Sequence, residues 1–448
     1  MHIDFLINEF ERNADATAII WQNKYYTYRW LIGQIAASAS YIKENKIGKG
    51  DVVALQGDFT PNTIALFLAL VNNQNIIAPF NNPMKSSEEQ KFDIAQIEKI
   101  ITVDTETDTF SFREFDYKSN HDFYLTLRKR EVPGLVLFTS GTSGTPKGAV
   151  HDFSKLLEKF KVKRKALRTV NFLLFDHWGG LNTLFYTISN GGVVLATKDR
   201  KPEPICEFIQ KHKIELLPAS PTFLNLLILS GIYNKYDLSS LKLITYGTEP
   251  MPETTLKRAK SIFPDIAFQQ TYGLIELGVL RSKSKSDDSL WVKVGGEGFE
   301  TRIVDNMLQI KADSAMLGYL NAPSPFTHDG YFMTGDQVEQ EGEYLKILGR
   351  KSEIINVGGE KVYPQEVENT ILTFDNVLDV TVYGEKNALV GNIVCARVLL
   401  KDAEEEVEFK KRLKSFCKAQ LQSFKVPVKI VVESGPLFND RYKKNRSV

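Results

Sequence analysis

Residues that hold transition metals are scarce in this 448-residue chain and never fall at ligand spacing. Its three cysteines, Cys206, Cys395 and Cys417, lie far apart and form no CxxC pair. Its six histidines include no pair at i, i+3 or i, i+4. We therefore expect no disulfide framework, no zinc site and no transition metal held by protein ligands.

Long apolar runs and an excess of charge are also missing. The longest apolar stretches, such as residues 64–71, are far too short to cross a bilayer, and residues 1–20 contain no basic flank followed by an apolar segment. The 56 Lys and Arg residues against 55 Asp and Glu leave a net charge of +1, which favours neither nucleic acid nor an anionic membrane as a partner. We expect a cytoplasmic protein that acts on a small molecule.

What is present is an alternation of short apolar strands and helical patterns. Strand-like runs occur at 51–57, 97–104, 134–141, 191–198, 214–221 and 241–249, and helical patterns occur at 62–73, 203–212 and 252–263. This order predicts an α/β fold with substantial parallel sheet. From about Ser286 the runs at 290–304 and 307–311 follow without a helix between them, which predicts a small β-rich subdomain.

The last hundred residues predict a separate α+β domain of ordinary size, with helices at 362–372 and 406–421 and strands at 377–385, 392–400 and 425–433. No low-complexity linker precedes it, so the boundary should be a short hinge near Arg350–Glu353. We expect a large N-terminal domain of several subdomains over 1–349 and a small mobile C-terminal domain over 350–448.

The strongest chemical signal is the segment Leu137–Gly148, LFTSGTSGTPKG. Its glycines let backbone N–H groups approach phosphate oxygens, its hydroxyls donate hydrogen bonds and its lysine adds positive charge. The Walker pattern does not fit, because TPKG follows Gly144, and a kinase-type P-loop is disfavoured. The predicted phosphate contacts are Thr139, Ser140, Gly141, Thr142, Ser143, Gly144 and Lys147.

This loop and five further segments resemble, in the same order, the adenylate-forming superfamily of acyl- and aryl-CoA synthetases, peptide-synthetase adenylation domains and beetle luciferases. The other segments are GTEP at 247–250, TYGLIE at 271–276, YFMTGD at 331–336, GRKSEIINVGGEKVYPQEVE at 349–368 and YKKNR at 442–446. The resemblance spans nearly the whole chain and is strongest to acyl-CoA synthetases. It implies a ligase that converts a carboxylic acid to acyl-AMP with ATP, releases pyrophosphate and passes the acyl group to a thiol.

The resemblance also assigns roles to residues. It implies that Glu276 binds Mg²⁺, that Asp336 accepts hydrogen bonds from the ribose hydroxyls beside Arg350, and that Lys443 is the catalytic lysine. It places the adenine slot, with the Tyr272 ring as a stacking face, at Gly247, Thr248, Glu249, Thr271, Tyr272 and Gly273.

Two residues depart from the family pattern. Tyr442 stands where a glycine usually precedes the lysine, so the path of this loop is open and adjacent Lys444 is the alternative catalytic residue. Ile275 stands where a threonine usually offers a hydroxyl to the α-phosphate or the substrate carboxylate, and its loss predicts slower adenylation or replacement by a neighbouring donor.

The segment LLFDHWGG at 173–180 can be aligned in two ways. His177 with Gly180 matches the HxxG of CoA synthetases, in which the histidine closes over the substrate carboxylate, whereas Asp176 matches an FD motif that would hold an α-ammonium. The candidate substrate pocket therefore comprises Asp176, His177, Trp178 and Gly180. The acid itself, whether aryl, fatty or amino, is left open.

The acceptor thiol is predicted from the hinge region. The resemblance puts the domain rotation at Ser352, and Gly358 and Gly359 would leave a narrow path for a pantetheine arm. This favours coenzyme A as the acceptor, with a separate carrier protein as the alternative. A nucleotide-binding protein without ligase activity is the alternative of another class.

Overall fold

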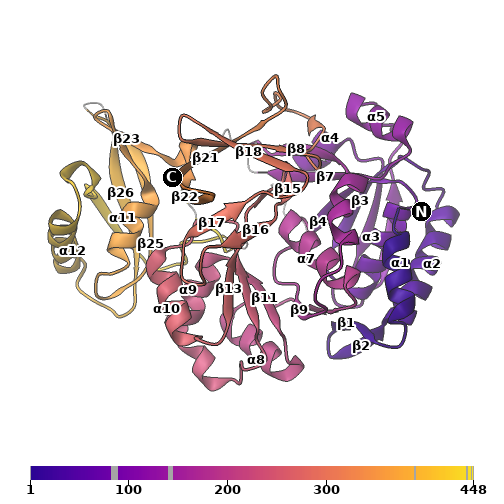
Figure 1. Cartoon of the computed structure of the whole chain (residues 1–448), viewed down its shortest axis with the longest axis horizontal. Coiled ribbons are helices and arrows are strands. Elements are labelled where there is room, and N and C mark those ends of the chain that lie inside the picture. Colours follow the sequence, from indigo (N-terminus) through magenta and orange to yellow (C-terminus); the bar gives the residue numbers. More distant parts are fainter. Residues whose placement is uncertain are drawn as a thin grey trace.

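The computed structural model describes residues 2–81, 89–139, 145–387, 390–439, 442–444 and 446. Two seven-stranded sheets form the larger part of the molecule, and a smaller unit lies beside them (Figure 1). The α/β class and the parallel sheets predicted from the alternating pattern are confirmed.

The first sheet carries the predicted phosphate loop. Its three inner pairings are parallel, and an antiparallel pairing of β7 with β8 brings the two ends of that loop together. In spatial order its strands are β20 (Gly318–Tyr319), β8 (Lys147–Asp152), β7 (Gly134–Thr139), β4 (Ile76–Asn81), β3 (Val52–Gly57), β5 (Lys99–Val103) and β6 (Phe110–Glu114).

The second sheet is parallel except for its edge pair β1 and β2. In spatial order its strands are β13 (Ala267–Gln270), β12 (Leu243–Tyr246), β11 (Leu216–Ala219), β9 (Arg168–Val170), β10 (Val193–Ala196), β1 (Thr17–Trp21) and β2 (Lys24–Thr27). The carboxyl ends of these parallel strands meet at one edge, which is where ligands usually bind in open α/β sheets.

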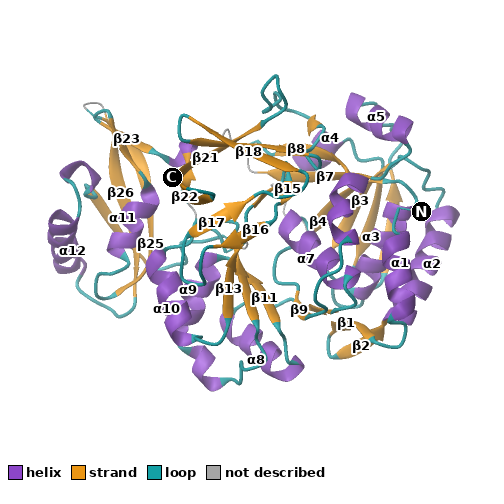
Figure 2. Ribbon diagram, in the orientation of Figure 1, coloured by secondary structure: helices purple, strands orange, loops and turns teal. Residues whose placement is uncertain are grey.

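Helices fill the space between the sheets and cover their outer faces (Figure 2). One core cluster contains residues of both sheets and of the helices α1 (Asp4–Arg12), α2 (Tyr28–Glu44), α3 (Pro61–Asn72), α6 (Phe153–Leu157) and α7 (Trp178–Ser189). The outer face of the second sheet packs on α8 (Pro202–His212), α9 (Pro221–Ser230) and α10 (Glu253–Ile262). The outer face of the first packs on α4 (Gln90–Ala95) and α5 (Asp122–Arg130).

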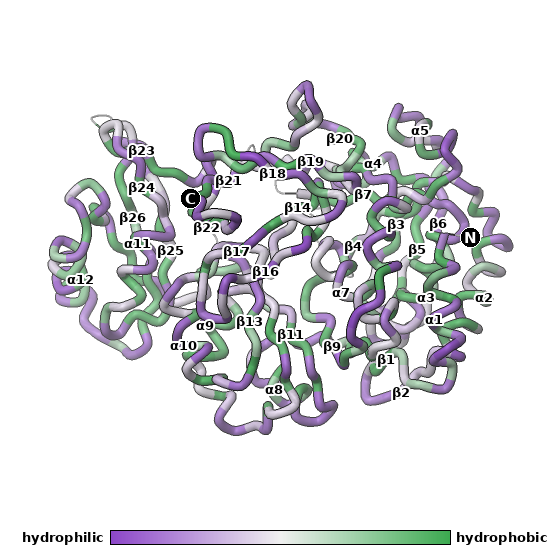
Figure 3. The backbone as a smooth tube through the Cα atoms, in the orientation of Figure 1, coloured by the Kyte–Doolittle hydropathy of each residue, from purple (hydrophilic) through white to green (hydrophobic). Residues whose placement is uncertain are grey.

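The local sequence explains where the central helix α3 begins. Thr60 caps α3 by accepting a hydrogen bond from the backbone N–H of Thr63, and Pro61 occupies the first turn, where its missing N–H costs nothing. Hydrophobic segments gather in the sheets and in the helices between them (Figure 3). No helix within the described ranges combines the length and the apolarity that a membrane span requires.

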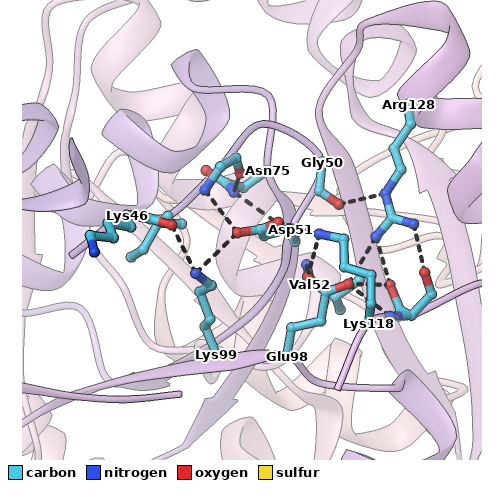
Figure 4. A network of polar contacts seen from close by, with 12 residues as sticks. Lys46, Gly50, Asp51, Val52, Asn75, Glu98, Lys99, Lys118 and Arg128 are labelled. Carbon is cyan, nitrogen blue, oxygen red and sulfur yellow. Dashed lines mark hydrogen bonds and ion pairs between the residues drawn. The ribbon is translucent and has the colours of Figure 1, made fainter. Parts of the chain in front are cut away.

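A buried ion-pair network fastens the first sheet (Figure 4). The Glu98 side chain is only 2% exposed and accepts hydrogen bonds from Arg128 at 2.9 Å, Lys118 at 3.1 Å and the Ser119 hydroxyl at 2.6 Å. Asp51 pairs with the same Lys118 and with Lys99. Both side-chain oxygens of Glu98 therefore accept hydrogen bonds from the segment 118–128. The network joins this segment, which precedes β7, to the starts of β3 and β5.

The predicted β-rich subdomain is an antiparallel six-stranded sheet. It begins at Ser282, slightly before the expected start. Its strands are β16 (Ser282–Ser284), β17 (Trp291–Val294), β22 (Tyr344–Arg350), β21 (Phe332–Glu341), β19 (Met307–Ala312) and β18 (Phe299–Val304). A short hairpin of β14 (Gly273–Leu274) and β15 (Gly278–Val279) lies before it.

The C-terminal unit has its own hydrophobic core, which begins at Ile355. The core of the β-rich sheet ends with Ile347, so the predicted boundary at 349/350 falls in the interval between the two cores and stays a prediction. The unit comprises β23 (Ile355–Val357), β24 (Glu360–Val362), α11 (Pro364–Ile371), β25 (Val377–Asn387), β26 (Gly391–Leu400), α12 (Glu406–Gln420) and β27 (Lys429–Glu433).

Candidate active site

A narrow pocket lies where the end of the chain meets the second sheet. It brings together three predicted site residues that are far apart in sequence, His177, Thr248 and Lys443. The rest of its lining is Phe172, Leu173, Leu174, Arg200 and Tyr442. The catalytic lysine and the HxxG histidine predicted from the sequence therefore share one pocket.

Lys444, the alternative catalytic lysine, binds groups of the C-terminal unit. The Lys444 side chain is 8% exposed, and its ammonium group donates to the Val380 carbonyl at 2.7 Å and pairs with Glu368 at 3.3 Å and Asp379 at 3.6 Å. Burial alone raises the pKa of Glu368, but Lys444 and Arg446 outweigh it and hold the pKa below its ordinary value. Lys444 is a structural residue of the C-terminal core, and the geometry favours Lys443 for chemistry.

Tyr442 explains how a residue other than glycine fits before Lys443. Its backbone adopts the left-handed conformation, with φ of 50°, that glycine takes most readily. Its hydroxyl donates to the Arg200 carbonyl at 3.0 Å, and its ring packs on Phe172 and Phe223, with centroids 5.7 and 5.5 Å away. The tyrosine thus anchors the end of the chain to the N-terminal domain, at a backbone cost of about 1–2 kcal/mol.

His177 caps the N-terminus of α7. Its Nδ1 accepts a hydrogen bond from the Gly179 backbone N–H at 3.1 Å, which favours the neutral tautomer with the proton on Nε2. Gly180 is required because a Cβ there would lie 2.2 Å from the Leu174 carbonyl oxygen. The HxxG glycine therefore shapes the turn that positions the histidine.

The other two predicted pocket residues lie deeper. Trp178 is 2% exposed and packs edge-on against Phe153 in the core, with centroids 6.2 Å apart. Asp176 is also buried and does not line the pocket of His177. Their contact with a substrate stays a prediction, and the arrangement supports the HxxG alignment over the FD alignment.

Glu276, the predicted magnesium ligand, is buried and held by a residue that sequence reasoning missed. The Tyr319 hydroxyl donates to its Oε1 at 2.6 Å, and the Lys147 ammonium lies 5.5 Å from the centroid of the Tyr319 ring. Burial and Glu276 together raise the pKa of Tyr319, so it stays a donor. The described residues contain no group of three or more Asp, Glu, His or Cys side chains suited to a metal ion.

The predicted phosphate loop emerges from a strand pair, with Thr139 opposite Lys147 at its two ends. Asn321 braces the second arm, because its side chain accepts from the Gly148 N–H at 3.1 Å and donates to the Pro146 carbonyl at 2.8 Å. This brace was not predicted. Five predicted phosphate contacts lie outside the described residues, namely Ser140, Gly141, Thr142, Ser143 and Gly144.

Asp336 and Tyr272 form one cluster with Arg350. The Tyr272 hydroxyl donates to Asp336 Oδ2 at 2.5 Å, and Arg350 Nε lies 3.3 Å from Oδ1. Burial raises the pKa of Asp336 against the opposing effects of Arg350 and Tyr272. The Tyr272 ring is 7% exposed, so its predicted stacking on adenine stays a prediction.

The GTEP segment is shaped by a close backbone approach. A Cβ at Gly247 would lie 2.7 Å from the Thr271 carbonyl oxygen, and Thr271 in turn donates through its hydroxyl to the Tyr246 carbonyl. Thr248 has φ of 73°, a strained value for a β-branched residue. Glu249 accepts from the backbone N–H groups of Thr222 and Lys444, which links this segment to the end of the chain.

Gly273 is exposed, and the remaining predicted residues follow the β-rich sheet in the chain. Ser352 is the middle residue of a single 3-10 turn, η4 (Lys351–Glu353), between the two cores. Gly358 and Gly359 form the β23–β24 turn with φ of 60° and 94°, and among the described residues no atom lies within 4 Å of a Cβ placed at either. The path that these glycines would leave for a pantetheine arm stays a prediction.

The chain was compared with protein-family models, with named relatives and with solved structures. Residues 8–332 match the family model described as AMP-binding enzyme, and residues 366–437 match that of the AMP-binding enzyme C-terminal domain. The chain is 24% identical to a long-chain-fatty-acid–CoA ligase of Bacillus subtilis over 94% of this chain and 89% of that protein. It is 26% identical to a 2-succinylbenzoate–CoA ligase of Listeria innocua over 96% of this chain and 97% of that protein.

Solved structures show the same fold. An anthranilate CoA ligase in complex with anthranoyl-AMP superposes with a TM-score of 0.80 at 18% identity, covering 98% of this chain and 95% of its own.

Proposed function

The chain belongs to the AMP-binding enzyme family, and from this premise we propose that it is an AMP-forming acid–CoA ligase. It joins a carboxylic acid to the AMP part of ATP, releases pyrophosphate and transfers the acyl group to the thiol of coenzyme A. The observation that carries the proposal is the pocket shared by His177, Thr248 and Lys443. Relatives named as CoA ligases, aligned over 94% and 96% of the chain, support coenzyme A over a carrier protein as the acceptor.

In the first half-reaction a carboxylate oxygen of the acid attacks the α-phosphorus of ATP. Negative charge grows on the α-phosphate and on the departing pyrophosphate, and the Lys443 ammonium group offsets it, since a fixed charge in a protected pocket stabilises a transition state more than water does. The Nε2–H of His177 donates to the acid and holds its carboxylate in line. The ammonium and the imidazole need to reach the same carboxylate, which their shared pocket permits.

The nucleotide is held by two clusters. Asp336 accepts hydrogen bonds from the ribose hydroxyls, while Tyr272 and Arg350 fix the direction of its oxygens. Lys147, together with Thr139 and residues 140–144, contacts the phosphates. The Asn321 brace keeps the arm that carries Lys147 in place.

The residues present fit Mg²⁺ held mainly by its substrate. This ion commonly takes one or two protein carboxylates and completes its octahedron with phosphate oxygens and water. Glu276 supplies one such carboxylate, which Tyr319 orients through Oε1. Bound there, the ion would neutralise phosphate charge.

The second half-reaction requires a different arrangement. Lys443 lines the pocket of His177 in the present orientation, whereas the Gly358–Gly359 turn is not among the residues that line it. We propose that the unit from 350 to 448 rotates about Ser352, withdraws Lys443 and brings the glycine turn to the thiol path. Attack of the thiolate on the acyl carbonyl then releases AMP.

One experiment tests the function and the acceptor together. Pyrophosphate release from ATP is measured with fatty, aryl and amino acids, with and without coenzyme A, and the products are identified by mass spectrometry. We expect acid-dependent pyrophosphate release and an acyl-CoA product. ATP binding without pyrophosphate release for every acid would refute the ligase, and acyl-AMP that reacts only with a carrier protein would refute coenzyme A as the acceptor.

A further inference from the structure

A second cavity, of about 310 Å³, lies against the far half of α7. Tyr186 and Ser189 of that helix and Asn190, which follows it, line the cavity on one side. The single-turn helix η2 (Glu158–Lys161), the β15 strand and the start of β18 line the others. None of its lining residues has a role in the function proposed above.

Among the described residues, four cationic side chains line this cavity, and three of them, Lys159, Arg164 and Arg281, interact with one another. The Lys159 ammonium group donates to the Asn182 side-chain oxygen and to the Val279 carbonyl, both at 2.7 Å, and both acceptors are neutral. Burial, together with the smaller effects of the nearby Arg164 and Arg281 guanidinium groups, lowers the pKa of Lys159 to about 7. Within the part of the chain that the structure describes, none of the three forms an ion pair with a carboxylate.

The carboxylates of the lining do not complete the cluster. Glu158 forms an ion pair at 2.5 Å with Lys161, which is not one of the three cations. Neither it, Glu297 nor Asp313 is among the groups that set the pKa of Lys159. A partly buried cation cluster without an anion is costly, because charges removed from water need a counter-charge. The cavity therefore has the volume and the charge to take an anionic group.

The cavity is joined to the reaction pocket by two elements. Asn182, the partner of Lys159, lies five residues after His177 on α7, about 7.5 Å along the helix axis at 1.5 Å per residue. Val279, the other partner, follows Ile275 and Glu276 through the β14–β15 hairpin. The Lys159 ammonium group thus contacts α7 about one and a half helical turns after the histidine proposed to hold the reacting carboxylate.

We propose that this cavity receives a second anionic group of the acid substrate, so that the enzyme selects dicarboxylic acids over monocarboxylic acids of the same length. The inference rests on the proposed ligase function. The reacting carboxylate lies at His177 and Lys443, and the distal carboxylate lies among Lys159, Arg164 and Arg281. Hydrogen bonds to Asn182 and to Val279 hold the Lys159 ammonium group, and Lys159 itself lines the cavity.

The test compares matched acids. Values of kcat/KM for pyrophosphate release are measured with hexanoate, octanoate and decanoate and with adipate, suberate and sebacate. We expect the wild-type protein to prefer at least one diacid over its monoacid by about tenfold or more, since hydrogen bonds to charged groups are the stronger kind. Lys159→Met should lower the diacid-to-monoacid ratio about ten- to hundredfold, whereas Lys161→Met, an exposed neighbour, should leave it unchanged.

Arg281→Met provides a second variant that should lower the same ratio if Lys159→Met fails to fold. Equal kcat/KM values for each wild-type pair, or an unchanged ratio in both variants, would overturn the inference. Stimulation of monoacid turnover by inorganic phosphate would also overturn it, because the cavity would then serve a separate effector. Failure of every acid to release pyrophosphate would instead refute the ligase function itself.

Discussion

The adjacent lysines Lys443 and Lys444 should separate catalysis from stability. Lys443 lines the pocket of His177. Lys443→Ala therefore removes the ammonium group whose positive charge would offset the negative charge that develops on the pyrophosphate. Loss of one such group commonly costs a hundred- to a thousandfold in kcat. We therefore expect adenylation to fall by about two to three orders of magnitude while the free energy of unfolding is nearly unchanged.

Lys444→Met should lower the free energy of unfolding and leave the adenylation rate nearly unchanged. It leaves Glu368 and Asp379 buried without their shared cation, since their side chains are only 2% and 3% exposed. Breaking a buried ion pair by removing one partner typically costs about 3–5 kcal/mol. The C-terminal unit should unfold at a lower denaturant concentration, and the folded protein should still adenylate at a rate near that of the wild type.

Two measurements on each variant test whether Lys443 serves catalysis and Lys444 serves stability. Adenylation is followed as acid-dependent pyrophosphate release, and stability as denaturant unfolding of the C-terminal unit. Thioester formation from preformed acyl-AMP serves as the control reaction, because it does not need Lys443 and should survive Lys443→Ala. The reasoning fails if Lys443→Ala adenylates normally, or if Lys444→Met loses adenylation with its stability intact.

Three further outcomes are expected. Asp336→Ala should raise the KM for ATP about ten- to hundredfold, because two charge-assisted hydrogen bonds to ribose are lost; an unchanged KM in steady-state kinetics would contradict the ribose assignment. Ser352→Pro fits the φ of a 3-10 turn, so it should retain pyrophosphate release but block thioester formation from acyl-AMP; equal loss of both activities would indicate misfolding. Burial raises the pKa of Asp108 to about 6, so this carboxyl contributes stability below its unfolded pKa of about 3.9 and loses it as pH rises through 6. Asp108→Asn should therefore gain up to about 3 kcal/mol relative to the wild type between pH 4 and pH 7, and parallel urea-unfolding profiles would refute this.

The elements that local sequence dictates were predicted well. The apolar run at 62–73 lies in α3 and its C-cap, with Thr60 and Pro61 setting the start of the helix, and the run that begins at Gly134 contains β7 (Gly134–Thr139). Two of the six motifs, GTEP and YKKNR, and the separate segment LLFDHWGG also led to residues of the pocket. Some of their glycines are required by the local backbone. Gly180 and Gly247 show this requirement directly, since a Cβ at either would collide with backbone oxygen.

What the sequence could not supply depends on chain segments that meet only in the fold. Tyr319 orients Glu276 from a strand that pairs with β8, and no pattern in its neighbourhood signals that contact. The choice between Lys443 and Lys444 was left open because neighbouring residues of an extended segment point to opposite sides, and only the fold decides which side holds the pocket. Arg281 likewise joins Lys159 and Arg164 at the second cavity from a distant part of the chain.

Tyr442 gives the proposed domain rotation a temperature dependence. Its ring packs among Phe172, Phe223 and Phe438, and a rotation that withdraws Lys443 has to pull the ring from its contacts with the first two. Undocking transfers apolar surface to water, which carries a positive heat-capacity change and becomes easier on cooling. The balance between the orientations that serve adenylation and thioester formation should therefore shift toward the undocked state as temperature falls, and a plot of the overall rate against inverse temperature should curve.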